Sequence, residues 1–123
     1  MIHDDYIVTY SVNLKERVII IQTYNSIKKI YRKIYFSGVL THSFKCIIDY
    51  NIISDIHECE INSFIIDNQE ELVDLEGHCW PVDYQTENEL IKFLLINEYK
   101  YIKITSSYGM FGWILAKSYE FKE

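Results

Sequence analysis

The first part of the chain alternates apolar and polar residues with the period of a half-buried β-strand. Over residues 6–12 every even-numbered position is Tyr or Val. A polar turn at residues 13–16 separates this segment from the β-branched run Val18–Ile21. The two segments therefore predict a β-hairpin.

Residues 28–36 fit two patterns. A period of two places Ile30, Ile34 and Phe36 inward, whereas helical spacing aligns Ile27, Ile30, Tyr31, Ile34 and Tyr35. The β-branched and aromatic content favours a strand, although a strand places Arg32 inward. Further strands are predicted at 41–48 and 52–59, separated by a turn at 49–51.

From Ile61 the apolar period becomes helical. One face of residues 61–75 is apolar, the other carries acidic residues, and Gly77 is a natural C-terminal stop. Residues 78–85 form a connector, and Thr86 with Glu89 fits the capping box of a second helix ending near Asn97.

The last part of the chain returns to strands. Residues 101–105 alternate, Ser107–Gly112 form a turn, and residues 113–119 form the returning strand. The element order predicts an α+β fold with a single globular domain, residues 1–123. Its antiparallel sheet is expected to have five to seven strands, with two helices packed on one face.

Composition agrees with a globular, cytoplasmic chain. Of 123 residues 49% are hydrophobic, with one proline and four glycines, which excludes a disordered or fibrous class. No apolar run reaches the roughly 18 residues of a membrane helix, and residues 1–5 do not resemble a signal peptide. Three cysteines without a pairing pattern are expected to be reduced.

The charges are strongly segregated along the chain. Between Lys45 and Lys92 there are twelve carboxylates and no Lys or Arg, so a net charge of -6 leaves +6 on the two flanks together. A solvated helix face would carry both signs, so this block predicts an acidic surface that binds a basic partner protein with salt-sensitive kinetics. The predicted partner-binding residues are Asp55, Glu58, Glu60, Asp67, Glu70, Glu71, Asp74 and Glu76.

The sequence contains no catalytic signature, and the chain is predicted not to be an enzyme. His57, Cys59, His78 and Cys79 are the candidate zinc ligands, but adjacent side chains such as His78 and Cys79 point apart on an extended chain. No metal or cofactor is therefore expected. The segment Gly109–Gly112 lacks the lysine and the helix start of a phosphate loop and is better explained as a hairpin turn.

A basic and aromatic cluster supports an alternative function. Lys28, Lys29, Arg32 and Lys33 are interleaved with Tyr31 and Tyr35, so one strand face could stack bases and contact phosphates. This pattern describes a nucleotide-binding or nucleic-acid-binding module. The net charge of -6 argues against nucleic acid as the main partner.

Three features make the chain resemble the small cytoplasmic immunity proteins that bacteria encode beside secreted toxins. They are the compact α+β layout, the acidic helix Asp67–Asp74 and the closing stretch Ser106–Ala116. The resemblance implies a non-enzymatic inhibitor that binds a cognate toxin domain, often a basic nuclease, and blocks its active site or an adjacent surface. A phage-encoded inhibitor of a bacterial defence protein is a related alternative that predicts the same surface.

Overall fold

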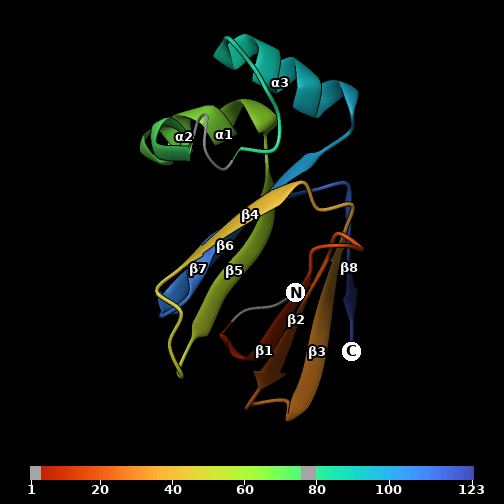
Figure 1. The fold of residues 1–123 in the computed structure, drawn as a ribbon. Coiled ribbons are helices and arrows are strands. Elements are labelled where there is room, and N and C mark those ends of the chain that lie inside the picture. The colour runs from red at the N-terminus through yellow and green to blue at the C-terminus, as the bar shows by residue number, and fades with distance from the viewer. Residues whose placement is uncertain (1–3, 76–79) are drawn as a thin grey trace.

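The structure is a computed structural model that describes residues 4–75 and 80–123. These residues form one eight-stranded antiparallel sheet and three short helices (Figure 1). The elements are β1 Asp5–Asn13, β2 Val18–Asn25, β3 Ile30–Ser37, β4 Thr41–Lys45, β5 Ile52–Cys59, α1 Ile61–Asp67, α2 Gln69–Leu75, α3 Glu87–Ile96, β6 Lys100–Tyr108, β7 Phe111–Ala116 and β8 Ser118–Lys122.

The sheet consists of two halves that meet at a narrow seam. Its strand order is β4-β7-β6-β5-β1-β2-β3-β8, but β1 pairs with β5 only through Asp5 with Ile53 and Tyr6 with Ile52. The halves β4-β7-β6-β5 and β1-β2-β3-β8 therefore diverge beyond the seam (Figure 1). The chain also crosses between them at Lys117, whose backbone N–H donates to the carbonyl oxygens of Ser37 and Gly38.

The inner faces of the two halves share one apolar core. Strands β2 and β3 contribute Ile19, Ile21, Ile34 and Phe36, all fully buried. From the other half come Ile53, Ile56, Ile102, Ile104 and Ile114. The period-two alternation in these strands thus places their β-branched residues on the inner face.

A second core forms where the helices cover the outer face of β6 and β7. Phe64 of α1 is fully buried and meets the rings of Trp113 and Tyr101 edge-on, at centroid distances of 4.8 and 5.2 Å. Leu90 and Leu94 of α3 belong to the same cluster. The outer face is consequently apolar at Tyr101 of β6 and at Trp113 and Leu115 of β7, while the inner face carries Ile102, Ile104 and Ile114.

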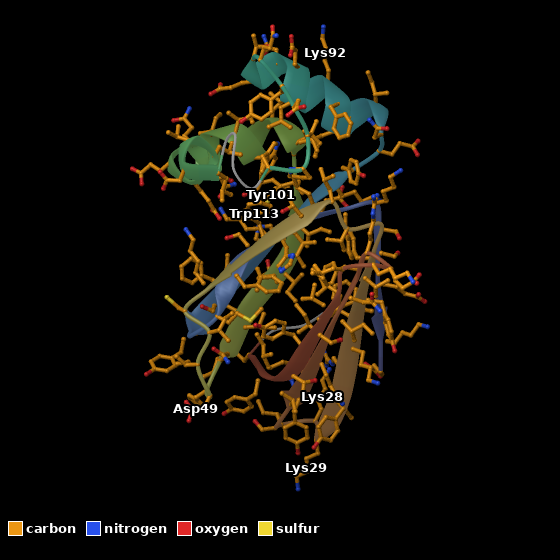
Figure 2. All side chains as sticks on the ribbon, viewed as in Figure 1. Lys28, Lys29, Asp49, Lys92, Tyr101 and Trp113 are labelled. Atoms are coloured by element: carbon orange, nitrogen blue, oxygen red, sulfur yellow. The ribbon has the colours of Figure 1, made fainter. Side chains whose placement is uncertain are left out.

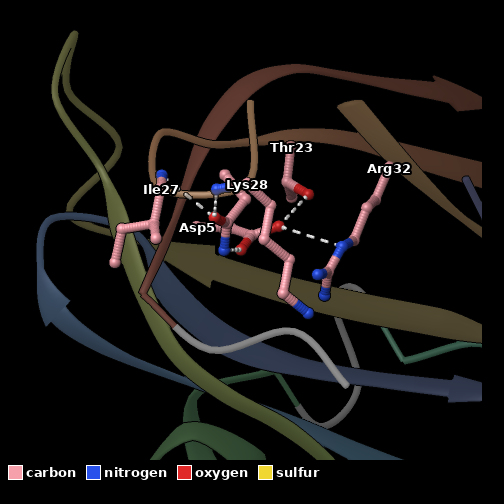
Figure 3. A network of polar contacts seen from close by, with 6 residues as sticks. Asp5, Thr23, Ile27, Lys28 and Arg32 are labelled. Carbon is pink, nitrogen blue, oxygen red and sulfur yellow. Dashed lines mark hydrogen bonds and ion pairs between the residues drawn. The ribbon is translucent and has the colours of Figure 1, made fainter. Parts of the chain in front are cut away.

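The strand predicted at residues 28–36 is confirmed as β3, and its inward arginine is accommodated by a buried acid. Arg32 is 6% exposed, and its Nε lies 3.9 Å from Oδ2 of the fully buried Asp5 (Figure 3). Asp5 also accepts hydrogen bonds from Thr23 Oγ1 at 2.8 Å and Asn25 Nδ2 at 2.9 Å. Asn25 Oδ1 in turn accepts from the backbone N–H of Lys28 at 2.8 Å, so the network holds the β2–β3 turn.

The predicted fold class is wrong in its number of elements, because the sheet has eight strands rather than five to seven and there are three helices rather than two. The extra strand arises because the segment expected at 113–119 bends at Lys117 and divides into β7 and β8.

The extra helix arises at Asn68. Its backbone N–H and its Nδ2 both donate to the carbonyl oxygen of Phe64, at 3.2 and 2.9 Å. This arrangement ends α1 and divides the helix expected over 61–75. The expected stop at Gly77 lies outside the described residues.

The start of the last helix is as predicted. Thr86 is the N-cap of α3, and its Oγ1 accepts from the backbone N–H of Glu89 at 3.2 Å. The Glu89 carboxylate reaches back to the N–H of Gln85, at 2.9 Å, rather than to that of the cap residue.

Candidate functional site

A polar row crosses the outer face of the β4-β7-β6-β5 half. Strand register aligns Ser43 with Trp113, Trp113 with Lys103, and Lys103 with His57. The helices cover the adjoining part of this face, which bears Tyr101 and Leu115 (Figure 2). Polar side chains of the sheet therefore lie at the border of the helical layer.

A groove of about 410 Å³ lies at this border, between the sheet and the α1–α2 junction. We call it the acid–lysine groove. It is lined by Ser43, Lys45, Asp67, Asn68, Glu71, Tyr101, Lys103, Ile104, Thr105, Ser106, Phe111, Gly112 and Trp113. Its size and its mixture of aromatic and polar groups are typical of a ligand site.

Two carboxylates of the helices are fixed in the groove by donors of the sheet. Asp67 Oδ2 accepts from the Tyr101 hydroxyl at 2.9 Å and lies 3.5 Å from Lys103 Nζ. Glu71 Oε2 accepts from Trp113 Nε1 at 3.2 Å and lies 3.7 Å from Lys45 Nζ. Each carboxylate thus has one neutral donor and one lysine.

The Tyr101 hydroxyl can act as the neutral donor to Asp67 because it keeps its proton. Burial raises the pKa of Tyr101 well above its ordinary value, and the hydrogen bond to Asp67 acts in the same direction, against an opposing contribution from Asn68. Burial likewise raises the pKa of the nearby Cys59 thiol. Both groups therefore remain neutral at physiological pH.

The other predicted residues on β5 do not join this groove. The Oδ2 atom of Asp55 lies 3.0 Å from Nδ1 of His57, on the outer face of the sheet. Glu58 faces the other way and accepts from the Tyr119 hydroxyl at 3.2 Å. Burial, followed by this hydrogen bond, raises the pKa of Tyr119. Glu60 is the N-cap of α1 and makes no side-chain cap bond.

Two further predicted residues, Glu70 and Asp74, are exposed on α2. A cavity of about 290 Å³ is lined by Gln69, Leu72 and Val73 of α2 and by Glu87 of α3, so Glu87 lies near this part of α2. No ion pair to Glu70, Asp74 or Glu87 is found among the described residues. We call these three residues the helical acidic face; the predicted Glu76 lies outside the described residues.

Large apolar side chains accompany this acidic face. Val73 is 72% exposed, and Ile66 at the end of α1 is 74% exposed. Exposed apolar side chains with polar groups around them are a feature of protein-binding surfaces.

Strand β3 shows the outward basic and aromatic face expected from the sequence. Tyr31 and Lys33 are exposed, Tyr31 packs on Tyr24 at a centroid distance of 4.8 Å, and Lys122 Nζ lies 5.0 Å from the Tyr35 ring centroid. Lys28 and Lys29, in the β2–β3 turn, lie at the end of the molecule opposite the helices (Figure 2). Lys28 and Lys29 are therefore far from the helices, whereas Lys45 and Lys103 lie 3.7 and 3.5 Å from the helix carboxylates of Glu71 and Asp67.

Sequence reasoning missed the basic and aromatic half of the groove. Lys45, Lys103 and Tyr101 were not singled out, and Trp113, which is 4% exposed, belongs to the second core. The useful signal was the alternation in β6, since it places Tyr101 and Lys103 on one face.

Within the described ranges, no three His, Cys, Asp or Glu side chains are grouped as a metal site requires. The candidate ligands His78 and Cys79 are outside those ranges. None of the described helices combines the length and apolar character needed to cross a membrane.

Comparisons with known proteins leave the family open. Neither the protein-family models nor the curated protein sequences gave a match. Among solved structures, the chain is similar to an uncharacterized protein from Neisseria gonorrhoeae at 15% identity, covering 100% of this chain and 94% of that one, with a TM-score of 0.48.

Proposed function

We propose that this chain is a non-enzymatic, cytoplasmic binding protein that inhibits a basic partner protein, as the immunity proteins of toxin loci do. The observation that carries the proposal is the helical acidic face, where Glu70 and Asp74 of α2 and Glu87 of α3 are exposed and form no ion pair with a described residue. Unrelieved carboxylates repel one another, so this arrangement has a stability cost that a cationic partner would remove.

The surroundings of the acidic face suit a protein partner. Val73 and Ile66 offer apolar contact area beside the carboxylates. Charge accelerates encounter with a positively charged surface, whereas desolvated apolar contacts slow dissociation. Both kinds of group are exposed on the helices.

Only some of the predicted acidic residues are proposed to contact the partner. Asp55 and Glu58 have partners within the fold, and they lie on opposite faces of β5. Glu70 and Asp74 form no ion pair with a described residue, and both belong to α2. The proposal therefore rests on α2 and the start of α3 rather than on the whole acidic block.

The test begins with capture of the partner from the native host and continues with association kinetics. The double variant Glu70→Lys/Asp74→Lys should lower the association rate constant by about tenfold or more at low salt and reduce its salt dependence. The matched control is Glu16→Lys/Asp49→Lys, which changes the net charge equally at two exposed loop positions. Figure 2 shows Asp49 far from the helices.

Two results would contradict the proposal. An equal decrease for both double variants would show that net charge alone matters. Unchanged kinetics for Glu70→Lys/Asp74→Lys would show that the helical acidic face takes no part in binding.

A further inference from the structure

The two carboxylates of the acid–lysine groove have unused acceptor capacity. Every hydrogen bond and ion pair that they make with described residues ends on Asp67 Oδ2 or Glu71 Oε2. A carboxylate accepts about four hydrogen bonds over its two oxygens. Asp67 Oδ1 and Glu71 Oε1 are therefore available to a donor that enters the groove.

The neutral donors fix the carboxylates more firmly than the lysines do. Tyr101 is fully buried and Trp113 is 4% exposed, so their positions are set by the second core. Moving either carboxylate away would leave a buried hydroxyl or indole N–H without its acceptor, which costs about 1–3 kcal/mol per group. The groove is consequently built to keep its negative charges in place.

The lysines are held loosely. Their Nζ atoms lie 3.5 and 3.7 Å from the carboxylate oxygens, longer than the roughly 2.7–2.9 Å of a charge-assisted hydrogen bond. Their side chains are also partly exposed, 54% for Lys45 and 39% for Lys103. Exposed ion pairs of this kind contribute only about 0–1 kcal/mol, so both ammonium groups can move into water at small cost.

A guanidinium group can take the place of the two lysine ammonium groups beside Asp67 and Glu71. Its planar set of donors can reach two acceptors at once, and it is less strongly hydrated than an ammonium group. The groove also offers aromatic rings, because Phe111 is 41% exposed at its lining and Trp113 lies beside it. Arginine gains from such rings through cation–π contact.

We propose that the acid–lysine groove receives an arginine side chain of the basic partner, with Asp67 and Glu71 as its acceptors and Lys45 and Lys103 displaced into solvent. The inference rests on the proposed function for the origin of the arginine. It adds a specific pocket to a surface that otherwise acts through charge and apolar contact.

The groove can be tested without the partner. The full chain, labelled with ¹⁵N, is titrated with N-acetyl-arginine methylamide, and the indole N–H resonance of Trp113 is followed by NMR. The variant Trp80→Phe, in which Trp113 is the one remaining tryptophan, assigns this resonance. Arginine should shift this resonance with saturation in the millimolar range. The neutral isostere N-acetyl-citrulline methylamide should bind at least about tenfold more weakly, a difference of about 1.4 kcal/mol.

Two variants locate the site. Asp67→Asn/Glu71→Gln keeps an acceptor oxygen at each position but removes the charges, and it should abolish the arginine-dependent shift. The matched control Glu70→Gln/Asp74→Gln, which removes two charges from the exposed face of α2, should leave the shift unchanged.

Equal binding of arginine and citrulline would overturn the inference, as would a shift that persists in Asp67→Asn/Glu71→Gln. A stronger response to N-acetyl-aspartate methylamide would identify an anion site instead. If Glu70→Lys/Asp74→Lys slows partner association while the arginine titration is blank, the groove inference fails and the proposed function stands.

Discussion

Replacing Asp5 by alanine should strongly destabilise the fold, because it removes the acceptor at the centre of a buried network. The Asp5 carboxylate is fully buried and receives Thr23 Oγ1 and Asn25 Nδ2 at 2.8 and 2.9 Å, with Arg32 Nε at 3.9 Å. The network joins β1, β2 and β3 beside the seam between the two sheet halves. Its loss would therefore affect the halves and the turn together.

The expected magnitude follows from the groups left without an acceptor. Removing one partner of a buried ion pair costs about 3–5 kcal/mol, mainly because the remaining buried charge loses an oppositely charged neighbour. The two neutral donors do not add their full cost, since members of one network are not additive. Natural domains are stable by about 5–15 kcal/mol, so Asp5→Ala should leave the protein marginally stable.

The assay is equilibrium unfolding in urea, followed by tryptophan fluorescence and far-UV circular dichroism. Thr23→Val, which removes one hydrogen bond to the buried carboxylate, should lower the free energy of unfolding by about 1.5–3 kcal/mol. The matched control is Thr9→Val, on β1 at an exposed contact of 3.5 Å with Gln22, which should change stability by less than about 0.5 kcal/mol.

Adding Arg32→Met to Asp5→Ala provides a second check. The double variant also removes the buried charge that Asp5 faces, so it should regain part of the lost stability. A loss below about 1 kcal/mol for Asp5→Ala would refute the reasoning, because such a value belongs to a solvent-exposed site. Equal effects of Thr23→Val and Thr9→Val would refute it as well.

Two further predictions concern β4 and its neighbour β7. Gly112→Ala should destabilise the fold by about 1–3 kcal/mol in urea unfolding, since the added Cβ would overlap the carbonyl oxygen of Ser43; a neutral effect would contradict this packing. Burial lowers the pKa of His42 from its ordinary value of 6.5, so on acidification the unfolded chain binds the proton before the folded chain does. The free energy of unfolding should therefore fall as the pH drops below 6.5, whereas His42 contributes nothing to the pH dependence above 6.5. The variant His42→Gln should lack this part of the acid-side loss in urea titrations, and an identical pH dependence for both proteins would contradict the assignment.

Much of the fold could be predicted because strands such as β2 and β3 alternate buried positions with more exposed ones. The alternation at 6–12 and the β-branched content of 28–36 identify β1 and β3 without any knowledge of their partners. The division at Lys117 could not be predicted, since no glycine or proline interrupts the apolar pattern there. The break at Asn68 was hidden because Leu72 continues the apolar face of the preceding helix.

The candidate site was only half visible in the sequence. The carboxylates of Asp67 and Glu71 stand out by charge, but their partners Lys45 and Lys103 come from strands that the register of the sheet brings together. The period of the strand could have separated Asp55 from Glu58, because positions three apart face opposite sides of a regular strand. The density of charges along the sequence does not show on which face of a strand a carboxylate lies.

The single-residue link at Lys117 ties the registers of β7 and β8 to each other. A slip of one position in either strand would turn its side chains to the opposite face, and the short link would pass the error to the other half of the molecule. Correct pairing of β3 with β8 therefore depends on correct pairing of β6 with β7, although these contacts lie in different halves of the sheet. The amides of β3 and β6 are thus expected to exchange with deuterium in one concerted opening, as parts of one cooperative folding unit.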